Sequence, residues 1–148
     1  MEQAQGILEG LDERQRTAAT TLQGPVRIIA GAGAGKTRTV TRRIAYACAT
    51  GAWKPERVLA VTFSVKAAAE MRARLGQLGV GGGTGRSGLG AGTAGVTAAT
   101  FHSAALHQLN SVWADICEAP FPHVIEDQRD VVSRAIIRAT ARTDADPL

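Results

Sequence analysis

Cysteine, aromatic residues and long apolar runs are all scarce in this sequence. Its two cysteines, Cys48 and Cys117, lie far apart and form no CxxC pair. That spacing excludes a disulfide-rich scaffold and a zinc knuckle, and it makes a reducing cytoplasm the expected location. No apolar run approaches the roughly 18 residues that a membrane helix needs. The start of the chain also lacks the basic and then apolar layout of a signal peptide, so we expect no membrane partner.

The rest of the composition is that of a globular domain. The chain has 148 residues, enough for one domain, of which 45% are hydrophobic and 20% charged. Residues 1–110 carry 13 Lys or Arg against 6 Asp or Glu, whereas residues 111–148 carry 4 against 7. A basic body suggests a polyanionic partner, either a nucleotide or a nucleic acid. Charge alone favours a simpler interpretation, a solvated basic surface.

Hydrophobic periodicity and chain-breaking residues predict alternating helices and strands. Asp12 and Gln15 form a capping-box pattern at the start of the first helix, and Ser64 can cap the third. The predicted helices cover residues 12–22, 36–50, 65–78, 101–113 and 127–142, and the predicted buried strands cover 26–30, 58–63 and 96–100. Strands separated by helices imply parallel pairing with right-handed crossovers. Residues 79–95 hold 9 glycines in 17 and are expected to form a surface loop or linker.

One motif carries specific chemistry: residues 30–37 read AGAGAGKT, between a predicted strand and a predicted helix. Glycines let the backbone turn tightly and aim successive N–H groups at phosphate oxygens, and the helix dipole favours the same anion. Lys36 would contact the β- and γ-phosphates, and Thr37 would give a hydroxyl ligand to Mg²⁺. The alternative is a chance Gly/Ala-rich turn, which the strand–helix context disfavours.

Three further segments flank this loop: residues 11–16 (LDERQR), 62–72 (TFSVKAAAEMR) and 100–103 (TFHS). Singly they have ordinary explanations: Gln15 as a surface residue, Phe63 and Phe101 as core aromatics, and His102 as a helix-start histidine. Two of them follow predicted strands, where an open α/β sheet binds its ligands. Together and in order, from about Leu8 to about Arg142, they resemble the superfamily-one DNA helicases of the UvrD/Rep/PcrA type. In detail the sequence looks closest to an actinobacterial UvrD-like paralogue.

The resemblance implies a fold and a set of roles. The fold would be an incomplete RecA-like P-loop α/β domain, with a parallel sheet flanked by helices over residues 1–113 and the start of an inserted helical subdomain over 114–148. ATP and Mg²⁺ would bind through Lys36 and Thr37, with Thr37 as the metal ligand. The remaining ATP contacts would come from Gln15, Ala32, Gly33, Ala34, Gly35 and Arg38. Single-stranded DNA would lie against Thr62, Phe63, Ser64, Thr100 and His102.

The sequence also departs from the family pattern. Ala34 replaces a usual Ser or Thr, which should matter little because backbone groups act there. Val65 stands where many relatives have Asn. The acidic motif that holds Mg²⁺ and activates water has no clear counterpart, since Glu126-Asp127 follows no buried strand. The resemblance therefore implies an amino-terminal fragment that needs a second RecA-like domain.

Three functions stay open at this point. The first is the ATP-binding part of a helicase or translocase, 3′ to 5′ by resemblance, that serves DNA repair or replication. The second is a truncated module that binds nucleotide or DNA and turns nothing over. The third, a small P-loop kinase, leaves the glutamine and TFHS motifs unexplained. Arg72 and Arg74 either contact DNA phosphates or solvate a helix face, and we expect the second for at least one of them.

Overall fold

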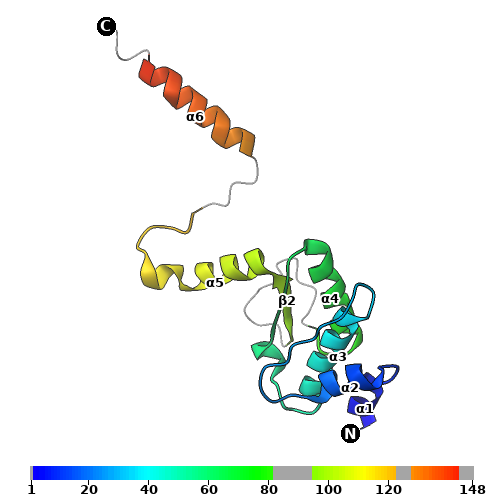
Figure 1. Cartoon of the computed structure of the whole chain (residues 1–148). Coiled ribbons are helices and arrows are strands. Elements are labelled where there is room, and N and C mark those ends of the chain that lie inside the picture. The colour runs from blue at the N-terminus through cyan, green and yellow to red at the C-terminus, as the bar shows by residue number, and fades with distance from the viewer. Residues whose placement is uncertain (1, 82–94, 123–127, 144–148) are drawn as a thin grey trace. The chain divides into compact units, whose positions relative to one another are not determined.

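The computed structural model describes residues 2–81, 95–122 and 128–143. By compactness the chain divides into two units, Met1–Leu109 and Asn110–Leu148 (Figure 1). Most of the glycine-rich segment 79–95 and the acidic pair Glu126-Asp127 lie outside the described residues. The first unit mixes helices with a two-stranded parallel sheet, which is compatible with the predicted α/β class.

The order of elements follows most of the sequence prediction. The helices are α1 (Glu2–Ile7), α2 (Glu13–Thr20), α3 (Lys36–Ala49), α4 (Val65–Gln77), α5 (Phe101–Ile116) and α6 (Gln128–Thr143), with a short 3-10 helix η1 (Pro55–Arg57). The strands are β1 (Leu59–Thr62) and β2 (Thr97–Thr100). The capping box at Asp12 and the Ser64 cap are both present, the latter accepting a hydrogen bond from the Ala67 N–H at 3.1 Å. Helix α1 was not predicted.

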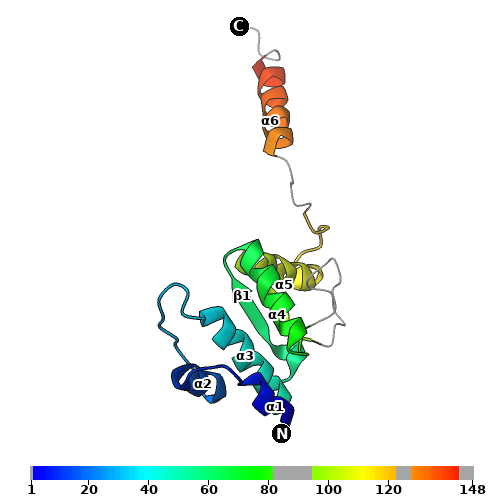
Figure 2. The same ribbon diagram turned by 90° about the vertical axis from the view of Figure 1, so that its right-hand side faces the viewer.

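The two strands pair in parallel, as predicted, with Leu59 opposite Thr97 and Thr62 opposite Thr100. Helix α4 connects them in sequence and packs on both. The main core lies between α3, α4 and the sheet, and it consists of Ile44, Ala60, Met71, Leu75, Val96 and Ala98. The prediction that this strand is buried is correct only in part. Leu59 is half-exposed, so one face of β1 is not covered. Figure 2 shows β1 behind α4 and beside α3.

The prediction of a strand at residues 26–30 is wrong. Within the described residues β1 and β2 pair only with each other, and residues 26–30 form no ladder. The link between α2 and α3 instead arches away from β1 and α4 (Figure 2). Val26 and Ile28 are half-buried while Ile29 is 81% exposed. The short apolar run that predicted a buried strand is present, but a strand also needs a neighbouring strand to satisfy its backbone groups.

A second, smaller cluster joins the amino-terminal helices to α3. Leu8, Leu11 and Ala19 are buried, and Tyr46 of α3 packs against them. In the second unit, Trp113 meets Phe121 edge-on at 5.3 Å and donates a hydrogen bond to the Ala119 carbonyl at 2.7 Å. None of the helices in the described ranges has the length and apolar character needed to cross a membrane.

Candidate functional site

The glycine-rich turn before α3 has the geometry of an anion-binding loop. Gly33 and Gly35 adopt left-handed φ angles of 76° and 79°, and the Ala34 N–H donates to the Gly31 carbonyl at 3.4 Å. Gly35 is the N-cap of α3, and no side chain caps the first turn of this helix. The first N–H groups of α3 therefore have no side-chain acceptor and point out of the helix end, where the dipole favours a negative charge.

Lys36, the first residue of α3, lies folded back over this loop. Its ammonium donates to the carbonyl of Ala30 at 2.8 Å and to that of Gly31 at 2.5 Å. The side chain is exposed, so the charge stays accessible from solvent. Phosphate oxygens entering the loop would compete for the same ammonium protons. The structure thus brings the predicted lysine and the predicted loop together.

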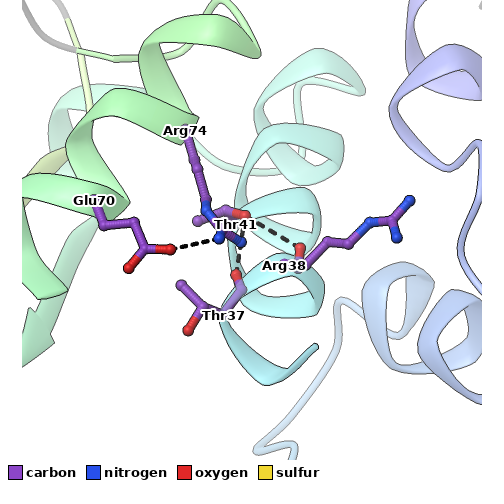
Figure 3. Close-up of polar contacts among 5 residues, drawn as sticks. All are labelled: Thr37, Arg38, Thr41, Glu70 and Arg74. Carbon is purple, nitrogen blue, oxygen red and sulfur yellow. Dashed lines mark hydrogen bonds and ion pairs between the residues drawn. The ribbon is translucent and has the colours of Figure 1, made fainter. Parts of the chain in front are cut away.

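The start of α3 is reinforced from inside the helix (Figure 3). The buried Thr41 hydroxyl lies within hydrogen-bonding distance of the Thr37 carbonyl at 2.9 Å and the Arg38 carbonyl at 3.1 Å. The Thr39 hydroxyl makes a similar bond to Gly35 at 3.2 Å. These bonds satisfy the Thr39 and Thr41 hydroxyls, which are buried in the first turns of α3.

Arg72 and Arg74 both have partners within the protein. Arg74 pairs with Glu70 at 2.5 Å on the face of α4 shown beside Thr37 and Thr41 in Figure 3. Arg72 donates to the Ala98 carbonyl of β2 at 2.8 Å. Arg74 is thus paired with a carboxylate, whereas Arg72 bonds a carbonyl and stays exposed, so whether either contacts DNA stays a prediction. A partly exposed pair such as Glu70–Arg74 contributes little stability.

Gln15 lies against the glycine-rich loop before α3. Its Nε2 donates to the Ala34 carbonyl at 3.2 Å, and its Oε1 accepts from the Asp12 N–H at 3.3 Å. Arg38 extends toward the amino-terminal helices (Figure 3), and its Nη2 lies so close to Gly10 that a Cβ there would be 2.6 Å away. The structure therefore brings Gln15 to the loop and Arg38 toward the same amino-terminal helices.

The predicted DNA-contacting residues gather at the carboxyl ends of β1 and β2. Because the strands are parallel and in register, the residues that follow them are neighbours: the Phe63 and Phe101 rings lie 5.0 Å apart, tilted by 39°. Phe63 is 88% exposed and Phe101 46%, so the alternative of two core aromatics is wrong. Sequence reasoning named Phe63 alone, although two Thr-Phe pairs at the ends of parallel strands were a signal for the pair.

The polar residues at this edge differ in their availability. Thr62 is half-buried and ends β1, whereas Ser64 and His102 are exposed. Thr100 is buried, and its hydroxyl caps α5 through the Ser103 N–H at 3.1 Å and pairs with the Ser103 hydroxyl at 2.9 Å. Thr100 thus holds the start of α5 and is less available to a ligand than His102.

Two arginines of α3 were missed by sequence reasoning. Arg42 donates to carbonyls just after α1, and Arg43 donates to carbonyls at the end of α2. Burial lowers the pKa of both side chains, and the charge of Arg38 lowers the pKa of Arg42 further, against a smaller raising effect of Glu9. The signal in the sequence was two consecutive arginines, Arg42 and Arg43, in the middle of a predicted helix.

Comparison with known proteins agrees with this arrangement. Residues 11–146 match the family described as "UvrD/REP helicase N-terminal domain". The chain is 43% identical over 140 residues to "ATP-dependent DNA helicase UvrD2" of Mycobacterium tuberculosis (strain ATCC 25618 / H37Rv), which covers 95% of this chain and 19% of that protein. It is 41% identical over 97 residues to "ATP-dependent DNA helicase PcrA" of Bacillus subtilis (strain 168), covering 66% of this chain and 12% of the relative.

A third relative is "DNA helicase II" of Escherichia coli (strain K12), 39% identical over 103 residues, which cover 70% of this chain and 13% of that protein. The chain thus spans about a fifth of the length of the first of these relatives and less of the other two. The family match covers more than nine-tenths of the chain and includes the loop, the glutamine motif and both strand-end motifs. This chain belongs to the UvrD/REP helicase N-terminal domain family.

Proposed function

We propose that this chain is the ATP-binding part of an ATP-dependent DNA helicase or translocase that acts on single-stranded DNA. The observation that carries the proposal is the loop at the start of α3, where the Gln15 amide lies on the Ala34 carbonyl and Lys36 lies over the same turn. A phosphate-binding turn and a base-reading amide in contact are what a nucleotide site requires. The names of the relatives support ATP and DNA as the two ligands.

The nucleotide would be held by backbone and side chains together. Loop amides from Ala32 to Gly35 and the Lys36 ammonium bind the phosphates, while Gln15 and Arg38 face the base. The Gln15 amide has one donor side and one acceptor side, which matches the donor and acceptor pattern on the edge of adenine. In the structure both sides are engaged with Asp12 and Ala34, so the base has to replace at least one of these bonds.

Mg²⁺ fits the same site through Thr37. Within the described residues the Thr37 hydroxyl makes no hydrogen bond, while the Thr37 carbonyl accepts one from Thr41 at 2.9 Å. A hydroxyl oxygen on the first turn after the loop is a suitable ligand for a hard cation. When bound, Mg²⁺ would neutralise charge on the phosphates, and Thr37 would fix its place relative to Lys36.

Single-stranded DNA would lie across the carboxyl ends of β1 and β2. The exposed Phe63, backed by Phe101, offers a ring on which a base can stack, worth about 1–3 kcal/mol per base. Thr62, Ser64 and His102 are the polar contacts, and Thr100 supports them by capping α5. We propose 3′ to 5′ movement on DNA in repair or replication, in the cytoplasm, from the family resemblance.

We also propose that the chain is a fragment of such an enzyme. Residues 1–113 would be part of a RecA-like domain and 114–148 the start of an inserted helical subdomain, which the division near Leu109 supports. A non-catalytic module that binds nucleotide or DNA is the second candidate, favoured by the lack of an Asp-Glu pair after a buried strand.

The test is ATP turnover by the chain, with and without single-stranded DNA, and with Lys36→Ala as the control. We expect Mg²⁺-dependent ATP binding that Lys36→Ala abolishes, without turnover until the second RecA-like domain is present. DNA-stimulated turnover by the chain alone would refute the fragment proposal and direct attention to Glu126 and Asp127. ATP binding that is unchanged in Lys36→Ala would refute the nucleotide site itself.

A further inference from the structure

Helix α2 carries Gln15 but has little of its own to hold it in place. It has eight residues, and Ala19 is its buried side chain. A helix this short is marginal in water, so contacts with the rest of the protein must determine its position. Its exposed polar residues cannot supply that energy by apolar burial. The direction of the Gln15 amide therefore depends on the anchors that tie α2 to α3.

The first anchor lies at the amino-terminal end of α2 and involves Gln15 itself. Its Nε2 bond to Ala34 reaches the loop just before α3. A Cβ on Gly35, the next residue, would lie 3.3 Å from the Gln15 Nε2, so a side chain there would press on the Gln15 amide. This anchor is also the contact that a bound base would have to break. It cannot hold α2 while Gln15 is reading the base.

The second anchor lies at the carboxyl end of α2 and is made by Arg43. Its Nη1 donates to the Ala18 carbonyl at 2.8 Å and to the Thr21 carbonyl. The last carbonyls of a helix lack partners within the helix and carry the negative end of its dipole, so a guanidinium suits them on both counts. The Arg43 guanidinium also lies over the Trp53 ring, 5.3 Å from its centre, and Trp53 packs against the main core.

The two anchors hold different parts of α2. On α3, Arg43 lies eight residues after Gly35, about 12 Å along the helix axis. On α2, the acceptor carbonyls of Ala18 and Thr21 lie three and six residues after Gln15. Besides the small apolar cluster around Ala19, α2 is therefore held at one end by a bond that the ligand replaces and at the other by bonds that the ligand leaves intact. Removal of the second anchor leaves α2 less firmly held when Gln15 turns to the base.

We propose that Arg43 is a positioning residue for base selection, which holds α2 so that the Gln15 amide stays within reach of an adenine. This inference rests on the proposed nucleotide site. Arg43 touches neither the loop nor the place of the phosphates, so its effect is confined to the base. Loss of Arg43 therefore weakens ATP selectively and leaves the binding of the phosphates alone unchanged.

The experiment measures binding of three probes to the 148-residue chain by calorimetry: Mg·ATP, Mg·GTP and Mg·tripolyphosphate. In Arg43→Met we expect the affinity for ATP to fall about tenfold, because the proposed pair of neutral hydrogen bonds between the Gln15 amide and adenine is lost. The affinities for GTP and tripolyphosphate should not change. Gln15→Ala should give the same selective loss. The double variant should lose no more than either single variant, because Arg43 acts through Gln15. Arg57→Met, at an exposed arginine of η1, is the matched control and should change nothing.

The variant Arg43→Lys keeps the charge and the ability to donate to carbonyls, but it lacks the planar group that lies over the Trp53 ring. It should show the same selective loss at smaller size, and it carries the test if Arg43→Met does not fold. An equal loss for all three probes, additive losses in the double variant, or unchanged ATP affinity in both Arg43 variants would overturn the inference. If one of these outcomes occurs and Lys36→Ala abolishes the binding of all three probes, the inference about Arg43 fails but the proposed nucleotide site stands. If the native chain binds no probe, both proposals fail.

Discussion

Alanine substitutions at the three glycines of the loop test whether its geometry is held without a ligand. Gly31 has an ordinary φ, and a Cβ there would meet nothing within 4 Å. Gly33 has a φ of 76° with equally open space around it. Gly35 has a φ of 79°, and a Cβ there would meet the Gln15 amide at 3.3 Å. The series therefore separates backbone strain from contact.

The expected free energies of unfolding follow from these differences. An alanine in the left-handed region costs roughly 1–2 kcal/mol, and replacing glycine returns about 0.4–1 kcal/mol by restricting the unfolded chain. Gly31→Ala should thus leave the protein unchanged or slightly more stable, and Gly33→Ala should destabilise it by about 1 kcal/mol. Gly35→Ala should lose about 1 kcal/mol more if the Gln15 bond to Ala34 is displaced.

Urea unfolding, followed by Trp53 fluorescence and far-UV circular dichroism, measures the series without nucleotide. Gln15→Ala combined with Gly35→Ala should cost less than the sum of the two single variants, because both remove the bond to Ala34 and only Gln15→Ala also removes the capping bond from Asp12. A Gly33→Ala chain as stable as the native one would refute the reasoning, since it would mean that the loop does not hold its left-handed turn when empty. A Gly31→Ala chain as unstable as Gly35→Ala would also refute it.

The remaining predictions concern two places away from the loop, the contact between Gly76 and Gly81 and the Cys48 thiol. Gly81→Ala should destabilise the fold by roughly 1–3 kcal/mol, because its Cβ would lie 2.8 Å from backbone atoms of Gly76. Gly76→Ala should instead stabilise α4 by up to about 1 kcal/mol, because its own Cβ points into open space. Urea unfolding measures both variants, and a change in the free energy of unfolding with the same sign in both would contradict the geometry. Burial, and then the charge of Glu56, raises the pKa of the Cys48 thiol. The protonated Cys48 thiol therefore contributes its full stabilisation at pH values below the pKa of the thiol in the unfolded chain. This stabilisation is lost as the pH rises through the pKa of the thiol in the folded chain. Iodoacetamide should modify Cys48 more slowly in the native than in the unfolded chain, and Glu56→Gln should speed the reaction of the native chain. Peptide mass spectrometry measures both rates, and equal rates for the native and the unfolded chain would refute this prediction.

Features with a local cause were predictable from the sequence. The capping box at Asp12 and the Ser64 cap involve residues three apart, and both form as expected. The segment 26–30 failed because a strand depends on a neighbour that no local pattern supplies. The exposure of Phe63 was expected only from the family resemblance, since an aromatic residue taken by itself is usually buried.

The site depended on both kinds of information. The AGAGAGKT motif determines the loop through its own glycines, so the place of Lys36 beside the loop could be predicted from sequence, while the ligand roles of Lys36 and Thr37 stay predictions. The contact between Gln15 and Ala34 joins residues 19 positions apart, and the motif predicts the neighbourhood but not the bond. The role of Arg43 could not be predicted, because its acceptors are backbone carbonyls, which carry no signature in the sequence.

Helix α4 joins the two edges at which we propose that the ligands bind. It begins at Ser64, beside the exposed aromatic pair, and its Glu70 and Arg74 lie on the side facing the start of α3 (Figure 3). Arg72 ties the same helix to the Ala98 carbonyl of β2, two residues before Thr100. If nucleotide binding displaces α3, the contact between α3 and α4 has to accommodate the displacement. Because packed cores deform little, a coupling between the two proposed sites would pass through α4 to the ends of the strands.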